Sequence, residues 1–428
     1  MAASLQRGKT SQFTELFTAS WVRKTGSIKT EISLKMWCYF RGKVSVVVDN
    51  RIREKYMTRI LVIHHYGGLG GAGKSLLINV RRLVKHAQVT IIVPKHPSDM
   101  YEILCEISQV NVVGVDYIPS FPVYSGGLSL TSPKLYSIAL KSILKYSNFR
   151  SLIESIPCDV IIANSMILCW VSLFFPTQIK ICFIRESKRS SIANMLIKKC
   201  LNRFDLVVFI SQFDRKEWGL QTKTNVLENA SDIEGTENKI TRFNPANADE
   251  KLCLLFMGGT SYIKGFYHFI LSVLLTKDKA RLKLIMLGDS KPLVEKSGQF
   301  LLNKFGIESL WYGKVKEISS FLSVCHVLVF PVVKVHQGRP LFEAGAFSKP
   351  VIAPDFENLS EFVTDNVNGL TYKRRSSRSL AKCLDRVVKG DFDLVCLGDS
   401  NYRRYCEKHT LNSSEKGFKI IIDEILQI

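Results

Sequence analysis

Short, continuously apolar runs alternate with amphipathic stretches along most of this chain. The runs are rich in β-branched residues, which is typical of parallel strands buried on both faces. They fall into two series: Arg59–Ile63, Val89–Val93, Asp159–Ala163, Lys180–Ile184 and Asp205–Ile210, then Leu252–Met257, Leu282–Leu287, Val327–Pro331 and Pro350–Ala353. Between the first two runs, Ser75–Val84 carries its leucines and valines on one helical stripe. Repeated strand–helix units predict parallel sheets covered by helices.

A polar segment separates the two series of strands. The sequence SDIEGTENKITRFNPANADE contains Gly, Pro and several Asn and has no apolar periodicity, which favours a linker. We therefore predict an α/β domain over residues 57–230, a linker over 231–250, a second α/β domain over 251–412 and a C-terminal helix over 413–428. Two domains of roughly 150–200 residues also suit a chain of 428 residues.

Residues 1–56 differ from the rest of the chain. They are basic, lack clear periodicity and precede the first strand, which begins just after Met57. Two interpretations are open. Met57 is the natural start and the upstream segment is a disordered extension or a start-site artefact, or the segment is a basic arm that touches a membrane.

The chain carries a strong excess of positive charge. Its formal net charge is +21, which favours polyanionic partners. One basic stretch holds Lys141, Lys145 and Arg150 among aromatic residues, and a second runs from Lys188 to Arg203. We expect either an anionic membrane surface as a partner or an ordinary solvated face. No nucleic-acid recognition module is evident, so we expect no nucleic-acid partner.

Cysteine usage and hydropathy bear on the compartment. The 11 cysteines are scattered, with no CxxC pair, which favours reduced thiols in a reducing compartment. No apolar run approaches the ~20 residues that span a bilayer, and the N-terminus lacks the apolar core of a signal peptide. We expect a cytoplasmic protein, peripheral on the inner face of the membrane.

One segment fits a phosphate-binding motif. Gly68–Ser75 matches GxxxxGK[ST] between a strand and a helix, as a P-loop requires. A P-loop enzyme also needs a carboxylate on a nearby strand end to hold magnesium, and in the first domain only Glu186 is a candidate. A nucleotide triphosphatase or kinase is therefore an alternative, while a glycine loop that contacts the phosphates of another ligand is the favoured interpretation.

Four landmarks follow one another in the second series of units. They are LLFMGGTSYIKGF, LIMLGD, HVLVFPVV and GRPLFEAGAFSKPVIAPDFENLSEFV. This order resembles the retaining glycosyltransferases of the GT-B fold, family 4 (glycosyl transferases group 1). The first-domain loop YGGLGGAGKSLL resembles the glycine loop of that family, and LENASD resembles its segment before the linker. The resemblance is most specific over residues 252–372, and it implies two Rossmann-like domains that face a central cleft.

The resemblance also implies an activity. A nucleotide sugar linked to UDP or GDP would bind the C-terminal domain, and a glycan or lipid-linked acceptor would bind the N-terminal domain. The sugar would be transferred with retention, in surface polysaccharide or lipopolysaccharide biosynthesis. The resembled arrangement needs no metal and no cofactor, and the sequence offers no convincing metal cluster.

The same resemblance assigns roles to three charged residues. Lys264 would neutralise the donor diphosphate as a point charge, and Arg339 would add a second positive charge. Glu343 would accept hydrogen bonds from the two ribose hydroxyls, because a carboxylate offers acceptors to both. These three residues are the predicted catalytic set. An internal ion pair between Arg339 and Glu343 is the simpler alternative.

Further positions complete the predicted site. Glycines would let backbone N–H groups approach the donor phosphates: Gly70, Gly71, Gly258, Gly259 and Gly288. Three residues that follow strands are predicted to face the cleft and the acceptor: Asn164, Arg185 and Glu186. An internal Arg185–Glu186 ion pair is the alternative for the last two.

Three positions depart from the family pattern. Val335 stands where a second glutamate is common, Gly259 where a basic residue is often found, and Asn164 where a histidine is frequent. These departures leave the donor sugar open. They also keep a third class in view, a catalytically inactive glycosyltransferase-like binding protein.

Overall fold

The computed structural model describes residues 57–120, 133–175, 178–188, 193–233, 242–336 and 338–427. The predictions for residues 1–56 and for the middle of the linker, residues 234–241, lie outside these ranges. The described residues contain two parallel sheets, each joined through helices. This arrangement confirms the predicted α/β class with two Rossmann-like units.

The first sheet has seven parallel strands in the order β3-β2-β1-β4-β5-β6-β7. Ile60 of β1 is in register with Val89 of β2 on one side and Val160 of β4 on the other. The strand order therefore reverses between β1 and β4, where a crevice forms beyond the carboxyl ends of the strands. In chain order the elements are β1 (Arg59–Ile63), α3 (Gly71–Leu83), β2 (Gln88–Pro94), α4 (Asp99–Cys105), β3 (Val110–Val115), α5 (Pro133–Ser155), β4 (Val160–Ala163), η2 (Met166–Leu173), β5 (Ile179–Ile184), α6 (Asn194–Leu201), β6 (Leu206–Phe209), α7 (Gln212–Trp218) and β7 (Thr224–Val226).

The second sheet has six parallel strands in the order β10-β9-β8-β11-β12-β13. Its order reverses between β8 and β11, which gives a second crevice at the carboxyl ends of those strands. The elements are β8 (Leu252–Phe256), α8 (Phe266–Leu275), η3 (Lys279–Arg281), β9 (Leu282–Leu287), α9 (Pro292–Lys304), β10 (Glu308–Gly313), α10 (Ser319–Val324), β11 (Val327–Val329), α11 (Arg339–Gly345), β12 (Val351–Pro354), η4 (Glu357–Leu359), β13 (Gly369–Tyr372), α12 (Ser377–Lys389), α13 (Leu394–Lys408) and α14 (Leu411–Gln427).

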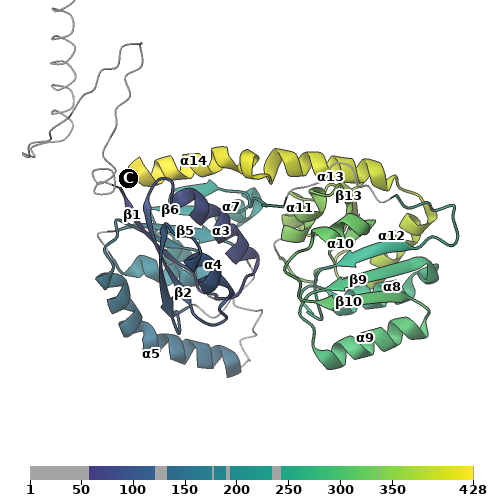
Figure 1. Cartoon of the computed structure of the whole chain (residues 1–428), viewed down its shortest axis with the longest axis horizontal. Helices are drawn as coiled ribbons and strands as arrows, with labels where there is room; N and C mark the ends of the chain where they lie inside the picture. Colours follow the sequence, from purple (N-terminus) through teal and green to yellow (C-terminus); the bar gives the residue numbers. More distant parts are fainter. Residues whose placement is uncertain are drawn as a thin grey trace, which may run out of the picture. The chain divides into compact units, whose positions relative to one another are not determined.

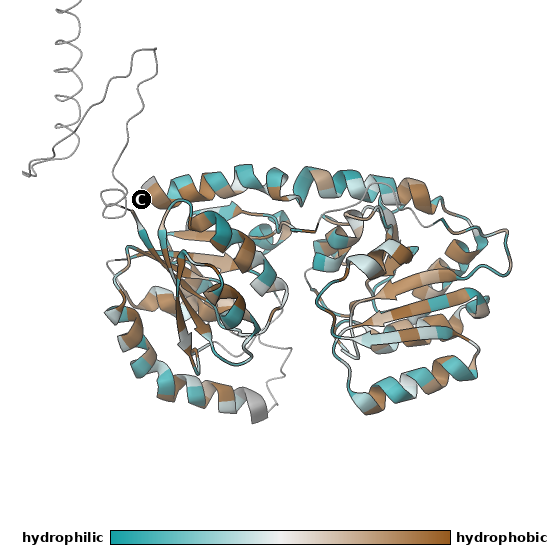
Figure 2. Cartoon of the chain, viewed as in Figure 1, coloured by the Kyte–Doolittle hydropathy of each residue, from teal (hydrophilic) through white to brown (hydrophobic). Residues whose placement is uncertain are grey.

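Each sheet has a hydrophobic core on both faces. In β1, Leu61 and Ile63 pack into the cluster on one face, and Ile60 and Val62 pack into the cluster on the other. The strands of the second sheet divide their side chains in the same way. Figure 2 shows the strands as mostly hydrophobic and the helices as mixtures of hydrophobic and hydrophilic residues. Burial on both faces explains why these strands are continuously apolar in sequence.

The C-terminal helix α14 packs on the first sheet, although it follows the second domain in the chain. Phe418 and Ile421 join the same core cluster as Leu77 of α3. The Arg82 guanidinium donates hydrogen bonds to the Leu411 carbonyl and the Ser414 hydroxyl, both at 2.7 Å. Figure 1 shows α14 in yellow over the first domain. The helix thus fastens the second domain to the first.

All nine predicted strands are present, within one or two residues at each end. The prediction omitted β3, β7, β10 and β13, which are the four edge strands of the two sheets. No helix among the described residues is long and apolar enough to cross a membrane.

Candidate active site

A cavity of about 480 Å³ lies where the two crevices meet. Its walls come from the loop after β1, the start of α3, the ends of β8 and β9, the residues after β11 and the start of α11. Eight of the eleven predicted site residues line it: Gly70, Gly71, Arg185, Gly258, Lys264, Gly288, Arg339 and Glu343. The predicted cleft between two Rossmann-like domains is therefore present as a continuous cavity.

Arg339 and Glu343 form a buried ion pair at the start of α11. Arg339 Nε lies 2.7 Å from Glu343 Oε1, one helical turn away, and the Glu343 side chain is 3% exposed. Burial raises the pKa of the Glu343 carboxyl, and the nearby Arg339 and Lys74 charges act in the opposite direction. The internal ion pair between Arg339 and Glu343, which was the simpler alternative, is therefore present. Both residues of the pair also line the cavity, where they are in reach of a bound ligand.

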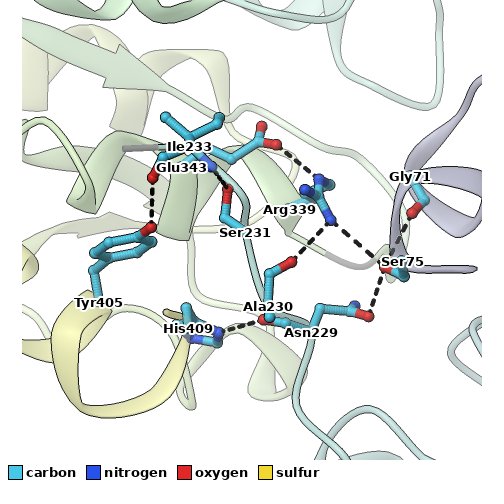
Figure 3. Close-up of polar contacts among 10 residues, drawn as sticks. All are labelled: Gly71, Ser75, Asn229, Ala230, Ser231, Ile233, Arg339, Glu343, Tyr405 and His409. Carbon is cyan, nitrogen blue, oxygen red and sulfur yellow. Dashed lines mark hydrogen bonds and ion pairs between the residues drawn. The ribbon is translucent and has the colours of Figure 1, made fainter. Parts of the chain in front are cut away.

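The guanidinium of Arg339 reaches across to the first domain. Its Nη1 donates to the Ala230 carbonyl at 3.3 Å and lies 3.5 Å from Ser75 Oγ. Ser75 Oγ in turn donates to Asn229 Oδ1 at 2.9 Å, as Figure 3 shows. Arg339 Nη2 is buried and has no hydrogen-bond partner among the described residues. A cavity-lining arginine therefore retains an unused donor.

Arg185 enters the cavity from the end of β5 and is also buried. Its Nη1 donates to Asn229 Oδ1 at 3.1 Å, so Asn229 and Ser75 connect the two arginines. Arg185 Nη2 likewise lacks a partner among the described residues. Burial lowers the pKa of Arg185 to about 10, with Glu186 acting against this shift and Arg339 adding to it. Arg185 is still charged at neutral pH.

Asn164 does not face the cavity, contrary to its predicted place in the cleft. Its side chain is buried between His64 and Arg185, 3.0 Å from His64 Nδ1, and it accepts a hydrogen bond from Arg185 Nε at 3.3 Å. Asn164 therefore holds Arg185 in place. His64 directly follows β1, and burial lowers its pKa well below the usual value, so it packs as a neutral ring.

Glu186 also turns away from the cavity. Its carboxylate accepts hydrogen bonds from the Ser165 hydroxyl, from Met166 N at 3.3 Å and from Arg185 N at 3.1 Å. It thereby binds the first N–H groups of η2, whose dipole favours a negative charge there. The predicted acceptor contact is replaced by this capping role. The contact with Arg185 is made by the backbone N–H group.

Close packing requires glycine in the turn after β8. Gly259 has φ +54°, and a Cβ there would lie 2.0 Å from the Asp289 carbonyl oxygen. Its N–H donates to the Leu287 carbonyl at 2.8 Å, so this group is not free to bind a phosphate, contrary to the prediction. Gly258 and Gly288 do line the cavity, but the Gly288 N–H donates to the Gly313 carbonyl at 2.6 Å, so it is not free to bind a phosphate either. Lys264 reaches the same wall. Desolvation there lowers the pKa of its ammonium group, and the Asp289 charge acts in the opposite direction.

The P-loop alternative is not supported by the geometry of Gly68–Ser75. In a P-loop the backbone N–H groups of the loop point at phosphate. Here Gly70 N donates to the Gly68 carbonyl at 3.0 Å, and Leu69 N donates to the Asp99 carboxylate at 3.3 Å. The Ser75 hydroxyl, which would bind magnesium, lies within hydrogen-bond distance of the Gly71 carbonyl and of Asn229 Oδ1 and shares its one proton between them. The loop shapes the cavity wall.

The cavity is strongly cationic. Its lining holds five cationic side chains, Lys74, Arg185, Lys264, Lys314 and Arg339, against two carboxylates, Asp289 and Glu343. Lys74 and Lys314 were not in the predicted site. Among the described residues, no group of three or more His, Cys, Asp or Glu is placed to hold a metal ion. The chemistry of the wall suits a ligand with more than one negative charge.

Comparison with known proteins identifies relatives of part of the chain. Residues 237–409 match the family model described as glycosyl transferases group 1. An uncharacterized glycosyltransferase of Methanocaldococcus jannaschii is 28% identical over 142 residues, which cover 33% of this chain and 40% of that protein. The N,N'-diacetylbacillosaminyl-diphospho-undecaprenol alpha-1,3-N-acetylgalactosaminyltransferase of Campylobacter jejuni is 26% identical over 156 residues, which cover 36% of this chain and 40% of that protein. Each match spans less than half of the relative.

Solved structures agree in fold over a larger part of the chain. Anabaena Alr3699/HepE, crystallised in complex with UDP and glucose, has a TM-score of 0.65 and 17% sequence identity. The alignment covers 86% of this chain and 100% of that one. At this identity the likeness is one of fold, and it confirms the predicted GT-B architecture. The predicted resemblance to group 1 glycosyltransferases is confirmed by the family model and the named relatives.

Proposed function

We propose that this chain, whose residues 237–409 belong to the glycosyl transferases group 1 family, transfers a sugar from a nucleoside-diphosphate sugar to a glycan or lipid-linked acceptor. The observation that carries the proposal is the cavity between the two domains, with its cationic wall and its buried Arg339–Glu343 pair. The diphosphate of a nucleotide sugar supplies the negative charge that such a wall attracts. The complex of Anabaena HepE with UDP and glucose gives the proposal further support.

The proposed mechanism relies on charge stabilisation. The bond between the anomeric carbon and the phosphate oxygen breaks, and its electron pair stays on the released nucleoside diphosphate. Lys264 and Arg339 stabilise the charge that grows on the phosphate. Glu343 holds the ribose hydroxyls, and the sugar is transferred with retention. The acceptor hydroxyl oxygen bonds to the anomeric carbon, and its proton passes to the released phosphate.

The acceptor is proposed to bind the first domain, and the product to enter surface polysaccharide or lipopolysaccharide biosynthesis. The name of the Campylobacter jejuni relative supports a lipid-linked acceptor, because it specifies a sugar on diphospho-undecaprenol. No metal or cofactor is part of the proposal, since side-chain cations already face the leaving group. We place the enzyme in the cytoplasm, on the inner face of the membrane.

An exposed face of α5 supports the membrane contact. Four apolar side chains project from consecutive turns of its first half, with exposed fractions of 59–73%: Tyr136, Leu140, Ile143 and Leu144. Lys145 is exposed on the same helix. Apolar side chains beside lysines favour the boundary of an anionic bilayer, because both burial and charge contribute to binding there.

Binding to anionic vesicles is expected to depend on this face. The wild-type chain should co-sediment with vesicles of phosphatidylglycerol at low salt and less at high salt, because surface charges are then screened. Replacing both Ile143 and Leu144 with serine should reduce the bound fraction several-fold. A matched variant with Leu293→Ser and Phe300→Ser removes two exposed apolar residues from α9 and should bind as the wild type does. Equal losses in both variants would contradict a role for α5.

Nucleoside diphosphates are expected to raise the melting temperature without a metal ion. A ligand that binds only the folded state at about 100 times its Kd adds ~2.7 kcal/mol of stability, which is roughly 3 °C for a chain of this size. The measurement is thermal unfolding with UDP, GDP, their sugar derivatives and ATP with magnesium, with EDTA in the metal-free samples. A shift only with ATP and magnesium would support a triphosphatase. No shift with any nucleotide would support an inactive binding protein.

A further inference from the structure

Lys74 belongs to the GxxxxGK[ST] match, and the predicted catalytic set does not account for it. It lies in the first turn of α3, where the Ser75 hydroxyl and the N–H groups of Leu69 and Gly70 already have partners. Its side chain is half-buried and lines the cavity. It makes no hydrogen bond or ion pair to any residue that the structure describes. A lysine in this position is free to bind a ligand.

The helix places Lys74 on the face that meets the second domain. Gly71 and Ser75 are three residues before it and one after it, and both approach Arg339: a Cβ on Gly71 would lie 3.7 Å from Arg339 Cδ, and Ser75 Oγ lies 3.5 Å from Arg339 Nη1. Residues three apart share a helix face, so Lys74 follows Gly71 along the cavity wall. The effect of its charge on the Glu343 carboxyl agrees with this placement.

Lys74 has no ion-pair partner among the described residues, unlike two other cationic side chains of the cavity. Arg339 is paired with Glu343, and Lys314 lies 3.4 Å from the Asp99 carboxylate. Lys74, Arg185 and Lys264 form no ion pair among the described residues, although the charge of each acts on a nearby carboxylate. Lys74 and Arg185 both come from the first domain. The first domain therefore supplies part of the unpaired positive charge of the cavity.

We propose that Lys74, together with Arg185, binds the phosphate of the donor diphosphate that carries the sugar, from the first domain. This proposal rests on the proposed function. The diphosphate then lies between Lys264 and Arg339 on one side and Lys74 and Arg185 on the other. Lys74 stabilises the negative charge on the phosphate oxygen when its bond to the anomeric carbon breaks. Binding of the donor therefore also holds the two domains together.

The test compares nucleoside diphosphates with monophosphates. The affinities of the wild type, Lys74→Gln and Lys74→Arg for UDP, UMP, GDP and GMP are measured by calorimetry. For the base that the wild type binds, Lys74→Gln should weaken the diphosphate roughly tenfold to a hundredfold, because a charged hydrogen bond is lost, and weaken the monophosphate at most a few-fold. Lys74→Arg should retain most of the affinity. Lys85→Gln, which removes an exposed lysine just beyond α3, should change neither.

The outcomes separate this proposal from the proposed function. If Lys74→Gln binds the diphosphate as tightly as the wild type, or loses both nucleotides equally, Lys74 does not contact the sugar-bearing phosphate. If the wild type binds no nucleoside diphosphate, the proposed function fails, and inorganic pyrophosphate becomes the probe for the lysine. Tighter binding of pyrophosphate to the wild type than to Lys74→Gln would still support the phosphate site, and equal or absent binding would overturn it.

Discussion

Replacing Glu343 with alanine is expected to abolish sugar transfer and to lower the melting temperature by roughly 3 °C or more. The carboxylate is 3% exposed and lies 2.7 Å from Arg339 Nε. Its removal leaves a buried guanidinium without its partner, which costs ~3 kcal/mol or more, and each kcal/mol shifts the melting temperature by roughly 1 °C in a chain of this size. The measurements are thermal unfolding and the initial rate of donor turnover.

Glutamine at position 343 separates the two effects. Its amide oxygen can still accept the hydrogen bond from Arg339 Nε, so most of the stability should return. A neutral amide offers fewer acceptors to a ribose diol than a carboxylate does, so the affinity for the nucleoside should remain roughly tenfold lower. Glu308→Ala provides the control, because it breaks only exposed ion pairs on the edge strand β10. Wild-type turnover by Glu343→Ala would rule out contact with the donor.

Burial explains which strands could be predicted from the sequence. The interior strands β1 and β8 are enclosed on both faces, so they are runs of apolar residues with a clear pattern. The edge strand β10 contains Glu308 and Ser309 and is only partly buried. The edge strands β3 and β7 are likewise half-exposed, and β13 has only four residues. An edge strand lacks one neighbour, so its composition approaches that of a loop.

The same limit applies to the candidate site. The order of the motifs was sufficient to place Lys264, Arg339 and Glu343 on the cavity, because each follows a recognisable strand. Lys314 was missed because it follows β10, which was itself not predicted. Lys74 was noticed only as part of a P-loop pattern. Tertiary packing decides which polar groups far apart in the sequence form hydrogen bonds with one another. The spacing of residues within a motif does not reveal these partners.

Asn164 and Glu186 illustrate this limit. Both follow interior strands, so both were expected to face the crevice. The structure gives each a partner that turns it inward: Asn164 binds His64 and Arg185, and Glu186 binds the start of η2. Their role is to orient the residues around them. Arg185, held by Asn164 and Asn229, is the residue of this group that reaches the cavity.

Replacing Arg185 with methionine is expected to raise the melting temperature of the ligand-free protein while lowering turnover roughly a hundredfold or more. The Arg185 guanidinium is 8% exposed, and its Nη2 has no hydrogen-bond partner among the described residues. It also lies close enough to Arg339 for the two charges to oppose each other. Replacing such a group with an apolar side chain of similar length should stabilise the fold by about 1–3 kcal/mol. The loss of turnover follows from removing a donor that faces the leaving phosphate.

The opposite signs of these two effects make the test specific. If the bonds of Arg185 to Asn164 and Asn229 stabilise the first domain by more than the burial of the guanidinium costs, its loss would lower stability and activity together. Unfolding is measured without ligand and again with saturating nucleoside diphosphate. Arg185→Met should melt above the wild type in the first case and gain less from the ligand in the second. Arg185→Lys keeps the charge but loses the bonds to both asparagines, so it should recover part of the ligand effect without the gain in stability.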